Sequence, residues 1–424
     1  ADVIGGWTLS DNAILTYGVN QGVFIPLEDY FEKYCPNISA ILDLPGVREK
    51  MTAPDGHIYT IPYVCGDTTV GYSPYINTKW LENVGMSMPT TTDEFEAVLK
   101  AFKEQDANGN GDASDEIPFS TDPNNKHIEA MAGYFGLPMN KLGIAIQDEK
   151  VVYGGVSDTY REFLSWFHKL YAEGLVDVEL YTQDSSTWEG KGNQDLYGVS
   201  IAYGSNEFTG IPAAEERGDF DSMPVLNTDK DGIWLRDTEG FSVYRTQAVI
   251  TNKAEHPEII CRWFDNAFAL ENGIGCNRGP VGVIVNKEDD GYHAIDTTTL
   301  SEEDQEKYSW GNLWPQSLPK YLPADFEFVE EHPMYDEKKA TEEAYEANLT
   351  KEIIPSYWID LDKIDTFSDT NTAIKDFFEQ QQAQFVCGEL DIDNDADWKA
   401  YVDGMYSLGL EDWVATQGIE EIAK

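Results

Sequence analysis

A short acidic loop carries the residues whose types and spacing are best suited to chemistry. In the stretch Asp106-Ala-Asn-Gly-Asn-Gly-Asp112, oxygen-bearing side chains alternate with small residues. Such alternation in a tight loop directs successive oxygens toward one centre, and Ca²⁺ binds roughly six to eight oxygens at about 2.3–2.6 Å. Gly111 occupies the position at which a loop of the EF-hand type needs a sharp turn. The spacing predicts a calcium site with the ligands Asp106, Asn108, Asn110, Asp112, Asp115 and Glu116.

Two features of this loop bear on the calcium interpretation. Asn, Asp and Gly are also common turn formers, so an Asx-turn loop without a metal is the alternative. The twelfth position, which supplies a closing carboxylate in an EF-hand, is Ile117, so Asp115 and Glu116 must close the site instead. A second loop of this kind does not occur in the sequence, which favours a structural calcium ion over a calcium sensor.

An amphipathic helix leads directly into the loop. The threonine cluster Thr90–Thr92 can cap its first turn by accepting a bond from a free backbone N–H. Apolar residues follow at i, i+3, i+4 and i+7, namely Phe95, Val98, Leu99 and Phe102. This spacing predicts one buried helix face.

The rest of the chain alternates short apolar strands with helices, which is typical of an α/β fold. We expect strands at 1–4, 58–64, 69–72 and 197–202. We expect a helix at 157–174, capped by Ser157 and ended by Gly174. Another is expected at 256–272, with an apolar stripe of Ile259, Ile260, Trp263, Phe264, Ala267 and Phe268. Two stripes in the tail contain Ile374, Phe377, Phe378 and Phe385, and then Trp398, Tyr401, Val402 and Met405.

Composition excludes several classes of partner. The chain of 424 residues has 77 acidic and 29 basic residues, a formal net charge of −48. A polyphosphate would be repelled by this surface, so no nucleic acid is expected as a partner. Peripheral binding to anionic lipid is disfavoured for the same reason. Hydrophobic residues make up 41% of the chain, enough for a core, and the length suggests two lobes.

Common catalytic signatures are missing from the sequence. There is no Gly-x-Ser-x-Gly elbow, phosphate-binding loop or dinucleotide fingerprint, and no histidine pair with metal-ligand spacing. We therefore expect a protein that is not an enzyme. The five cysteines, Cys35, Cys65, Cys261, Cys276 and Cys387, have no zinc spacing, and one pair could be bridged without the sequence naming it. No apolar window is long enough to span a membrane.

Several segments resemble the extracellular solute-binding proteins (family 1) of bacterial ABC importers. The resemblance is to the large lipoprotein-like group that includes binders of alginate and other oligosaccharides. Its first part is the strand Asp55-Gly-His-Ile-Tyr-Thr-Ile-Pro62, the helix at 76–85 and the loop at 106–118. Further similar segments lie at 89–95, 151–154, 170–177, 181–184, 248–253, 388–390 and 409–413. In the loop this chain has three residues, 112–114, where relatives usually have two.

The resemblance implies an α/β, two-lobed periplasmic-binding-protein-like fold of type II, with the lobes joined by several hinge crossings and a ligand cleft between them. We expect one lobe to contain 1–118 and about 248–300, and the other 119–247 and about 301–424. The sequence begins inside an apparent strand, so we expect a missing first β-α-β unit. The family also implies a lipid anchor in that absent segment, on the extracellular face of the membrane.

The function implied is capture of an oligosaccharide, or another small polar solute, by lobe closure and its delivery to the membrane subunits of an ABC permease, by a monomer. Aromatic rings stack on sugar faces while polar groups bind hydroxyls. The expected ligand contacts are Trp7, Tyr63, Asp67, Trp188, Tyr203, Asn206, Arg245, Trp310 and Trp314. Each tryptophan could instead be a core residue, and Arg245 could be an ion-pair partner. The alternatives are a secreted carbohydrate-active enzyme or the same fold binding a peptide.

Overall fold

The computed structural model divides into two compact units, which are described separately. It describes the chain except residues 7–8, 67–68, 124–126, 211–217, 239–240, 296–298, 309–311, 313–317, 324–325, 327, 330–332, 420 and 424, and the side chains of 241, 333–336 and 365. Unit 1 consists of Ala1–Asp67, Thr238–Glu331 and Ser356–Ser368. Unit 2 consists of Thr68–Asp237, His332–Pro355 and Asp369–Lys424. The chain therefore passes from one unit to the other at five boundaries.

A four-stranded sheet forms the centre of unit 1. Its order is β1 (Val3–Gly5), β10 (Phe241–Ile250), β2 (Thr60–Gly66) and β13 (Lys320–Tyr321). The long strand β10 is antiparallel to both of its neighbours, and its pairing with β2 shifts register between Tyr244 and Ala248. Segments distant in the sequence are thus joined in one sheet.

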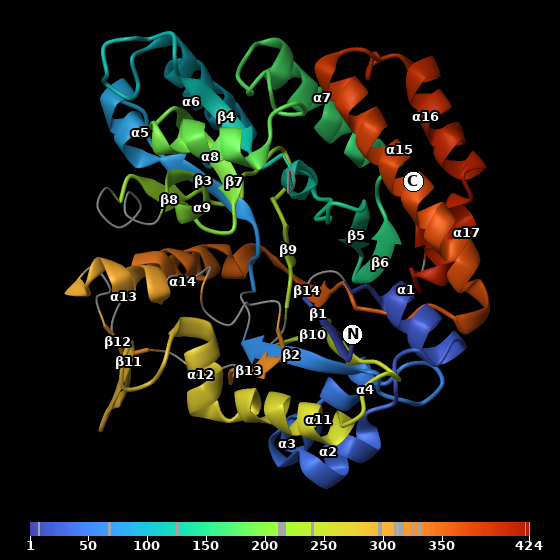
Figure 1. The fold of residues 1–424 in the computed structure, drawn as a ribbon. Helices are drawn as coiled ribbons and strands as arrows, with labels where there is room; N and C mark the ends of the chain where they lie inside the picture. Colours follow the sequence, from blue (N-terminus) through green and yellow to red (C-terminus); the bar gives the residue numbers. More distant parts are fainter. Residues whose placement is uncertain are drawn as a thin grey trace. The chain divides into compact units, whose positions relative to one another are not determined.

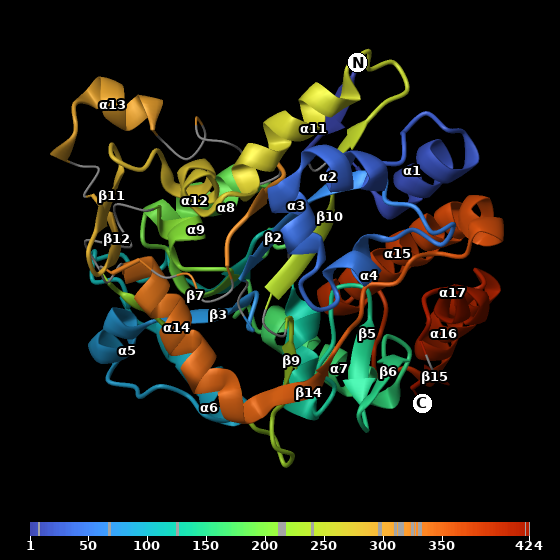
Figure 2. The ribbon, with the colours of Figure 1, turned by 90° about the horizontal axis from the view of Figure 1, so that it is seen from below.

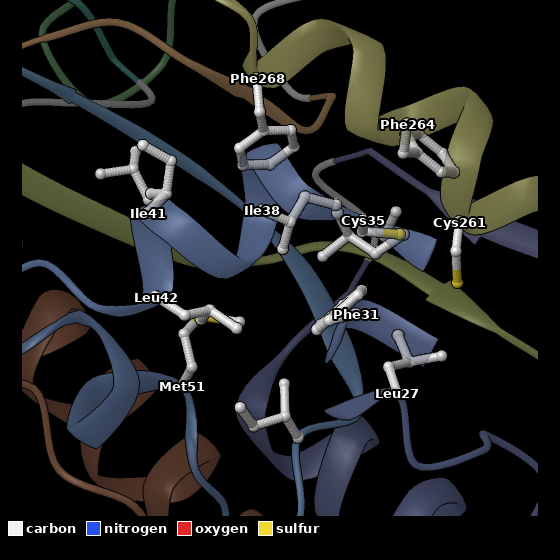
Figure 3. Close-up of a cluster of buried hydrophobic side chains, with 14 of the residues drawn as sticks. Leu27, Phe31, Cys35, Ile38, Ile41, Leu42, Met51, Cys261, Phe264 and Phe268 are labelled. Carbon is white, nitrogen blue, oxygen red and sulfur yellow. The ribbon is translucent and has the colours of Figure 1, made fainter. Parts of the chain in front are cut away.

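Short helices cover one face of this sheet (Figure 1). They are α2 (Glu28–Tyr34), α3 (Pro36–Leu42), α4 (Val47–Met51) and α11 (Pro257–Asp265). Their apolar side chains meet those of β2 and β10 in one buried cluster, which includes Phe31, Ile38 and Phe264 (Figure 3). The other elements of unit 1 are α1 (Asp11–Ile14), η1 (Leu15–Asn20), η3 (Asn266–Phe268), α12 (Leu270–Arg278), β11 (Val285–Glu288), β12 (Gly291–Ala294), α13 (Glu302–Lys307) and η7 (Leu361–Lys363).

The main sheet of unit 2 has the order β4 (Ile117–Thr121), β7 (Tyr197–Ala202), β3 (Ser73–Asn77) and β8 (Phe220–Ser222). Strands β4 and β7 are parallel, whereas β3 is antiparallel to β7 and β8. One further strand pair, β14 with β9, and one triplet, β15, β6 and β5, occur among the described residues of this unit. They contain β5 (Ile144–Gln147), β6 (Lys150–Tyr153), β9 (Trp234–Arg236), β14 (Leu349–Ile353) and β15 (Glu421–Ile422).

Helices surround these sheets in unit 2. They are α5 (Thr78–Val84), α6 (Thr92–Glu104), η2 (Ile128–Phe135), α7 (Asp158–Ala172), α8 (Ser185–Asn193), α9 (Asn206–Thr209), α14 (Pro333–Tyr345), η6 (Glu346–Asn348), α15 (Ile364–Cys387), α16 (Asp395–Ser407) and α17 (Leu410–Thr416). Helices α15 and α16 lie near α7, and α17 contacts α16 and β15 (Figures 1 and 2). Stacking of Tyr160 on Phe378, at 5.6 Å between ring centroids, joins α7 to α15.

Several predicted elements are confirmed. All four predicted apolar residues of α6 are buried, and the helix predicted at 157–174 is present as α7. Ser157 caps α7 by accepting a bond from the Tyr160 N–H at 3.2 Å. Strand β7 has the predicted bounds, Tyr197–Ala202. The buried tail residues Ile374, Phe378, Phe385, Trp398, Tyr401 and Met405 confirm the two C-terminal stripes as packing surfaces.

The strand predicted at 69–72 is wrong, because the structure places the strand at Ser73–Asn77 instead. Side chains bind the backbone of the earlier segment, so its groups are not available to a strand partner. The Gly71 N–H donates to Asp237 Oδ2 at 2.6 Å, and the Lys338 ammonium donates to the Gly71 carbonyl. The Thr69 N–H donates to Glu342 Oε1 at 2.7 Å.

The single helix predicted at 256–272 is also wrong. Helix α11 ends at Asp265, a short 3₁₀ turn follows, and α12 begins at Leu270 after an extended residue, Ala269. Phe264 and Phe268 of the predicted stripe are buried, whereas Ile259 and Trp263 are 59% and 57% exposed. Both exposed residues lie within α11, before the break, so the helix is shorter and its buried face is narrower than predicted.

The two units differ from the predicted lobes, 1–118 with 248–300 and 119–247 with 301–424. Residues 68–118 belong to unit 2, because β3 pairs with β7 and α6 leads into β4 of the same sheet. Residues 238–247 belong to unit 1, because β10 pairs with β1 and β2. Among the described residues, no helix is both long and apolar enough to cross a bilayer.

Candidate calcium loop and ligand-contact residues

The candidate calcium loop of unit 2 connects α6 to β4 and is held at both ends. At the start of α6, Thr91 Oγ accepts from the Glu94 N–H at 3.2 Å, while Glu94 Oε2 accepts from the Thr90 N–H at 2.9 Å. These reciprocal bonds fix the beginning of the helix. On the loop itself, Asn83 Nδ2 donates to the Ala107 carbonyl at 2.8 Å. The first loop residues are therefore anchored to α5.

Side-chain oxygens of the loop accept bonds from its own backbone. Asp106 Oδ2 accepts from the Gly111 N–H at 2.9 Å, and Asn108 Oδ1 accepts from the Asn110 N–H at 2.9 Å. Asn110 Oδ1 accepts from the Asp112 N–H at 2.7 Å. Gly111 has a φ of +95°, which an L side chain rarely adopts. The chain thus turns tightly around the carboxylate of Asp106.

Two carboxylate oxygens of the loop are buried without a hydrogen-bond partner. They are Asp106 Oδ1 and Glu116 Oε2. Glu116 uses its other oxygen, Oε1, to accept from the Ala107 N–H at 2.8 Å. Burial raises the pKa of Glu116, and the charge of nearby Asp115 adds to that rise. Because unpaired buried carboxylate oxygens are costly, this donor set fits a bound cation such as Ca²⁺.

The remaining predicted ligands differ in what their side chains do. Asn110 Nδ2 and Asn108 Nδ2 donate to the two carboxylate oxygens of Asp115, at 2.7 and 3.3 Å. The Asp112 carboxylate accepts from both the N–H and the hydroxyl of Ser114, and these bonds lower its pKa. Asp112 is therefore suited to offer a cation its backbone carbonyl rather than its side chain.

One other group of potential metal donors occurs among the described residues, in unit 1. Donor atoms of Glu288, Asp290 and His293 lie within 4.8 Å of one another on the β11–β12 hairpin. His293 Nε2 already pairs with Asp290 Oδ1 at 2.8 Å, and both carboxylates are exposed. This group lacks the buried, unpaired oxygens of the acidic loop.

Three of the predicted ligand-contact residues keep a position compatible with that role. Tyr203 directly follows β7 and is 39% exposed. Asn206, at the start of α9, is half-buried. In unit 1, Tyr63 lies on β2 and stacks on Tyr244 at 5.5 Å, with Lys320 Nζ 4.4 Å from its ring centroid, but it is only 8% exposed.

Two of the predicted contacts are structural residues instead. Trp188 is 2% exposed, because its ring packs on Phe208 while Nε1 donates to Ser200 Oγ at 3.2 Å. Arg245 is 4% exposed and forms a bidentate pair with Asp11, at 2.8 and 2.6 Å. Its guanidinium also lies 3.9 Å from the Trp358 ring centroid. Neither side chain is free to meet a ligand.

The other four predicted contacts, Trp7, Asp67, Trp310 and Trp314, lie outside the described residues.

The structure adds three residues around Tyr203 that the sequence did not single out. Tyr72 lies edge-on to Tyr203 at 6.1 Å and stacks on His127 at 4.0 Å. Lys338 of α14 lies with Nζ 4.1 Å from the Tyr203 ring centroid and donates to the Tyr203 carbonyl at 2.8 Å. No local pattern in the sequence could have joined positions so far apart. Together Tyr72, His127, Tyr203 and Lys338 form what we call the aromatic cluster of unit 2.

Burial determines the charge state of two members of this cluster. Burial lowers the pKa of His127 to about 4, and the cation of Lys141 acts in the same direction. Burial also lowers the pKa of Lys338 to about 8, although several carboxylates, Glu342 first, oppose that shift. At neutral pH the imidazole is therefore an uncharged ring stacked on a phenol. Such a surface, with one exposed ring and nearby polar groups, can pack against the face of a sugar.

Comparison with known proteins gives a substrate-binding protein and a lipoprotein among the relatives of this chain. No family model matches the chain. The fructooligosaccharide ABC transporter substrate-binding protein FusA of Streptococcus pneumoniae serotype 4 is 34% identical over 273 residues, 62% of this chain and 50% of the relative. Lipoprotein LipO of Bacillus subtilis strain 168 is 30% identical over 218 residues, 49% of this chain and 40% of the relative. The matches thus span about half the length of these curated relatives, or less.

Solved structures of FusA extend the likeness over nearly the whole chain. The complex of FusA with kestose has a TM-score of 0.83 and 26% sequence identity, and the match covers 98% of this chain and 86% of that one. An EF-hand mutant of FusA in complex with fructo-nystose has a TM-score of 0.81 at the same identity and coverage. The two-lobed α/β architecture expected from the sequence is confirmed by these matches.

Proposed function

We propose that this chain, which belongs to the extracellular solute-binding proteins of bacterial ABC importers, captures an oligosaccharide and passes it unchanged to a membrane permease. The observation that carries the proposal is the similarity to FusA, a fructooligosaccharide binder, in both sequence and structure. The relatives are binding proteins, and the sequence lacks common catalytic signatures, which supports binding without chemistry. The first ligands to examine are therefore short fructooligosaccharides such as kestose.

Tyr203 is the central proposed contact in unit 2. Its side chain is 39% exposed, while the ammonium of Lys338 and the edge of Tyr72 hold the ring in place. A ring that is fixed before the ligand arrives loses little conformational freedom on binding. Asn206 would offer an amide to the sugar hydroxyls, and Tyr63 would contribute from unit 1. Trp7, Asp67, Trp310 and Trp314 remain predicted contacts.

A structural Ca²⁺ ion in the acidic loop is the second part of the proposal. Asp106, Asn108, Asn110 and Glu116 would bind it through side-chain oxygens, Asp112 through its carbonyl, and Asp115 through its carboxylate. The two unpartnered buried oxygens support this assignment, as does the EF-hand described in FusA. The ion would neutralise the carboxylates and tie α6 to β4.

The localisation belongs to the same proposal. One curated relative, FusA, is a substrate-binding protein of an ABC transporter, and another, LipO, is a lipoprotein. We infer that this protein works at the extracellular face of the membrane, attached by a lipid, as a monomer that meets the permease subunits of its transporter. Binding by closure of the two units would follow if the ligand contacts both of them.

Titration calorimetry against a glycan panel tests the proposed function. We expect saturable binding of one class of oligosaccharide, and the variant Tyr203→Ala should weaken it about tenfold or more, equivalent to about 1.4 kcal/mol. Tyr406→Ala is the matched control, because Tyr406 is similarly exposed, at 42%, on α16 of the same unit.

Two outcomes would contradict the proposal. Release of reducing sugars from the bound glycan would favour a secreted carbohydrate-active enzyme. Saturable binding of peptides, with no glycan bound, would assign the same fold to another ligand class. Equal affinities of Tyr203→Ala and Tyr406→Ala for the glycan would remove Tyr203 from the site while leaving sugar capture intact.

A further inference from the structure

Two buried cysteines of unit 1 meet across the helical layer that covers its sheet. Cys35 joins α2 to α3, and Cys261 lies on α11. Both side chains are fully buried in the same apolar cluster, among residues such as Phe31 and Phe264 (Figure 3). Figure 3 shows the two side chains as neighbours within this cluster, and the Cys261 thiol is the largest cause of the raised pKa of the Cys35 thiol. Segments far apart in the sequence thus present two sulfur atoms to one point in the core.

The backbone around the two cysteines is fixed by a second set of bonds. Asp265, at the end of α11, accepts from the Ile38 N–H at 2.8 Å through Oδ1. Asn37 Nδ2 donates to Asp265 Oδ2 and to the Asp265 carbonyl, both at 3.1 Å. These bonds attach the first turn of α3 to the last turn of α11. The two thiols therefore stay close whenever this part of unit 1 is folded.

We propose that Cys35 and Cys261 form a disulfide when the protein folds in an oxidising compartment. The oxidant is a small-molecule or protein disulfide. One cysteine thiolate attacks it and releases a first thiol, and the second cysteine then displaces the remaining thiol from the mixed disulfide. Two protein thiols lose their hydrogen atoms, and one external disulfide is reduced to two thiols. The extracellular location proposed above is where such bonds persist, but the chemistry does not depend on it.

The bond should form during folding rather than afterwards. In the folded unit both thiols are shielded from solvent. The Cys261 thiol and burial together raise the pKa of Cys35, which disfavours the reactive thiolate. An external disulfide can therefore reach the two cysteines only while the helices are still forming. Once the core has closed, burial protects the new disulfide bond. A protein that has folded in reduced form should oxidise slowly.

The cross-link would close a very long loop. The whole segment 68–237 of unit 2 lies between the two cysteines in the sequence. Cross-links that close long loops restrict the unfolded chain most in the chain-entropy account. The disulfide would therefore stabilise unit 1 by linking its first sequence segment, Ala1–Asp67, to its second, Thr238–Glu331.

Refolding of the wild-type chain in a glutathione redox buffer tests the proposal directly. We expect the refolded protein to be lighter by two hydrogen atoms and to yield one disulfide-linked peptide pair containing Cys35 and Cys261. It should also retain three alkylatable thiols of the five cysteines. This readout needs no variant, so it holds even if a cysteine substitution impairs folding.

Two variants give an independent readout. Reductant should lower the thermal unfolding midpoint of the refolded wild-type protein by several degrees. Cys261→Ala should lose this response, whereas Cys276→Ala should keep it, because Cys276 lies outside the pair. The proposal is overturned if all five thiols remain free after refolding, or if the mapped bond joins other cysteines.

Discussion

In unit 2, Trp188 and Tyr203 differ in what surrounds their rings. Trp188 is enclosed by core side chains, and its indole N–H is satisfied by Ser200. Tyr203 is partly exposed, and its ring is contacted by the ammonium of Lys338. Both residues flank Gly- and Ser-containing segments in the sequence, so an aromatic count alone could not separate them. The distinction arises from tertiary packing.

His127 is the member of the aromatic cluster that should respond to pH. Its folded pKa is lowered to about 4, whereas an unfolded histidine has a pKa of about 6.5. Between these values the unfolded chain binds a proton that the folded unit does not bind. The contribution of His127 to stability is therefore complete above about pH 6.5 and is lost progressively as the pH falls toward 4.

We predict that His127→Phe, which keeps an aromatic ring without a titrating group, reduces this acid sensitivity. Thermal unfolding at pH 7 and pH 5 measures it. The midpoint of the variant should fall less between the two pH values than that of the wild type. His256→Phe is the control, since the His256 side chain is 67% exposed. Equal falls in His127→Phe and the wild type would show that the buried imidazole does not set the acid response.

Helix α6 and the acidic loop that follows it form one continuous structural segment. Thr91 and Glu94 fix the beginning of the helix, and the loop after its last residue turns around Asp106. The orphan oxygens of Asp106 and Glu116 lie at opposite ends of the loop sequence. A cation held between them would join the end of α6 to the start of β4.

We predict that chelation lowers the melting temperature of the protein and that Asp106→Ala abolishes this sensitivity. An ion present at about 100 times its dissociation constant stabilises by roughly 2.7 kcal/mol, which corresponds to several degrees. Asp112→Asn is a control within the loop, because it retains the backbone carbonyl proposed as the ligand. Elemental analysis should find calcium in Asp112→Asn and not in Asp106→Ala. The calcium assignment would be wrong if the wild-type protein contained no metal and its melting temperature did not change on chelation.

Helix α6 shows what the sequence could predict, and the segment 69–72 shows what it could not. The period of Phe95, Val98, Leu99 and Phe102 reflects local geometry, so it located the buried face correctly. The backbone of 69–72 is instead held by acidic and basic side chains from distant positions, such as Asp237. The same holds for Arg245, whose partner Asp11 lies far away in the sequence. Polar contacts between residues far apart in the sequence produce no periodic spacing, so a sequence pattern cannot predict them.

Each of the two units has its own core and its own proposed stabilising link, a calcium ion in unit 2 and a disulfide in unit 1. The acidic loop lies entirely in unit 2, and the cysteine pair lies entirely in unit 1. The sequence indicated two α/β lobes but misplaced their boundaries. It could not reveal that strands β3 and β4 both pair with β7, because strand partners are not encoded locally.

We predict that the loss of calcium loosens unit 2 selectively. Hydrogen–deuterium exchange with and without chelator should show faster exchange in α6 and β4, with little change in β2 and β10 of unit 1. The physical reason is that the ion would join only elements of unit 2. An equal increase in both units would indicate that the loop supports the molecule as a whole, contrary to its proposed local role.

The pairing of β1 and β2 with β10 affects how the chain can fold as it leaves the ribosome. The earliest strands have no sheet partner until residues 241–250 have emerged, and unit 1 still lacks its last segment until residue 368 has emerged. Unit 2 in turn waits for α16 and α17 near the very end. Neither unit can therefore reach its native state early in biosynthesis, and each completes its folding only after most of the chain has been made.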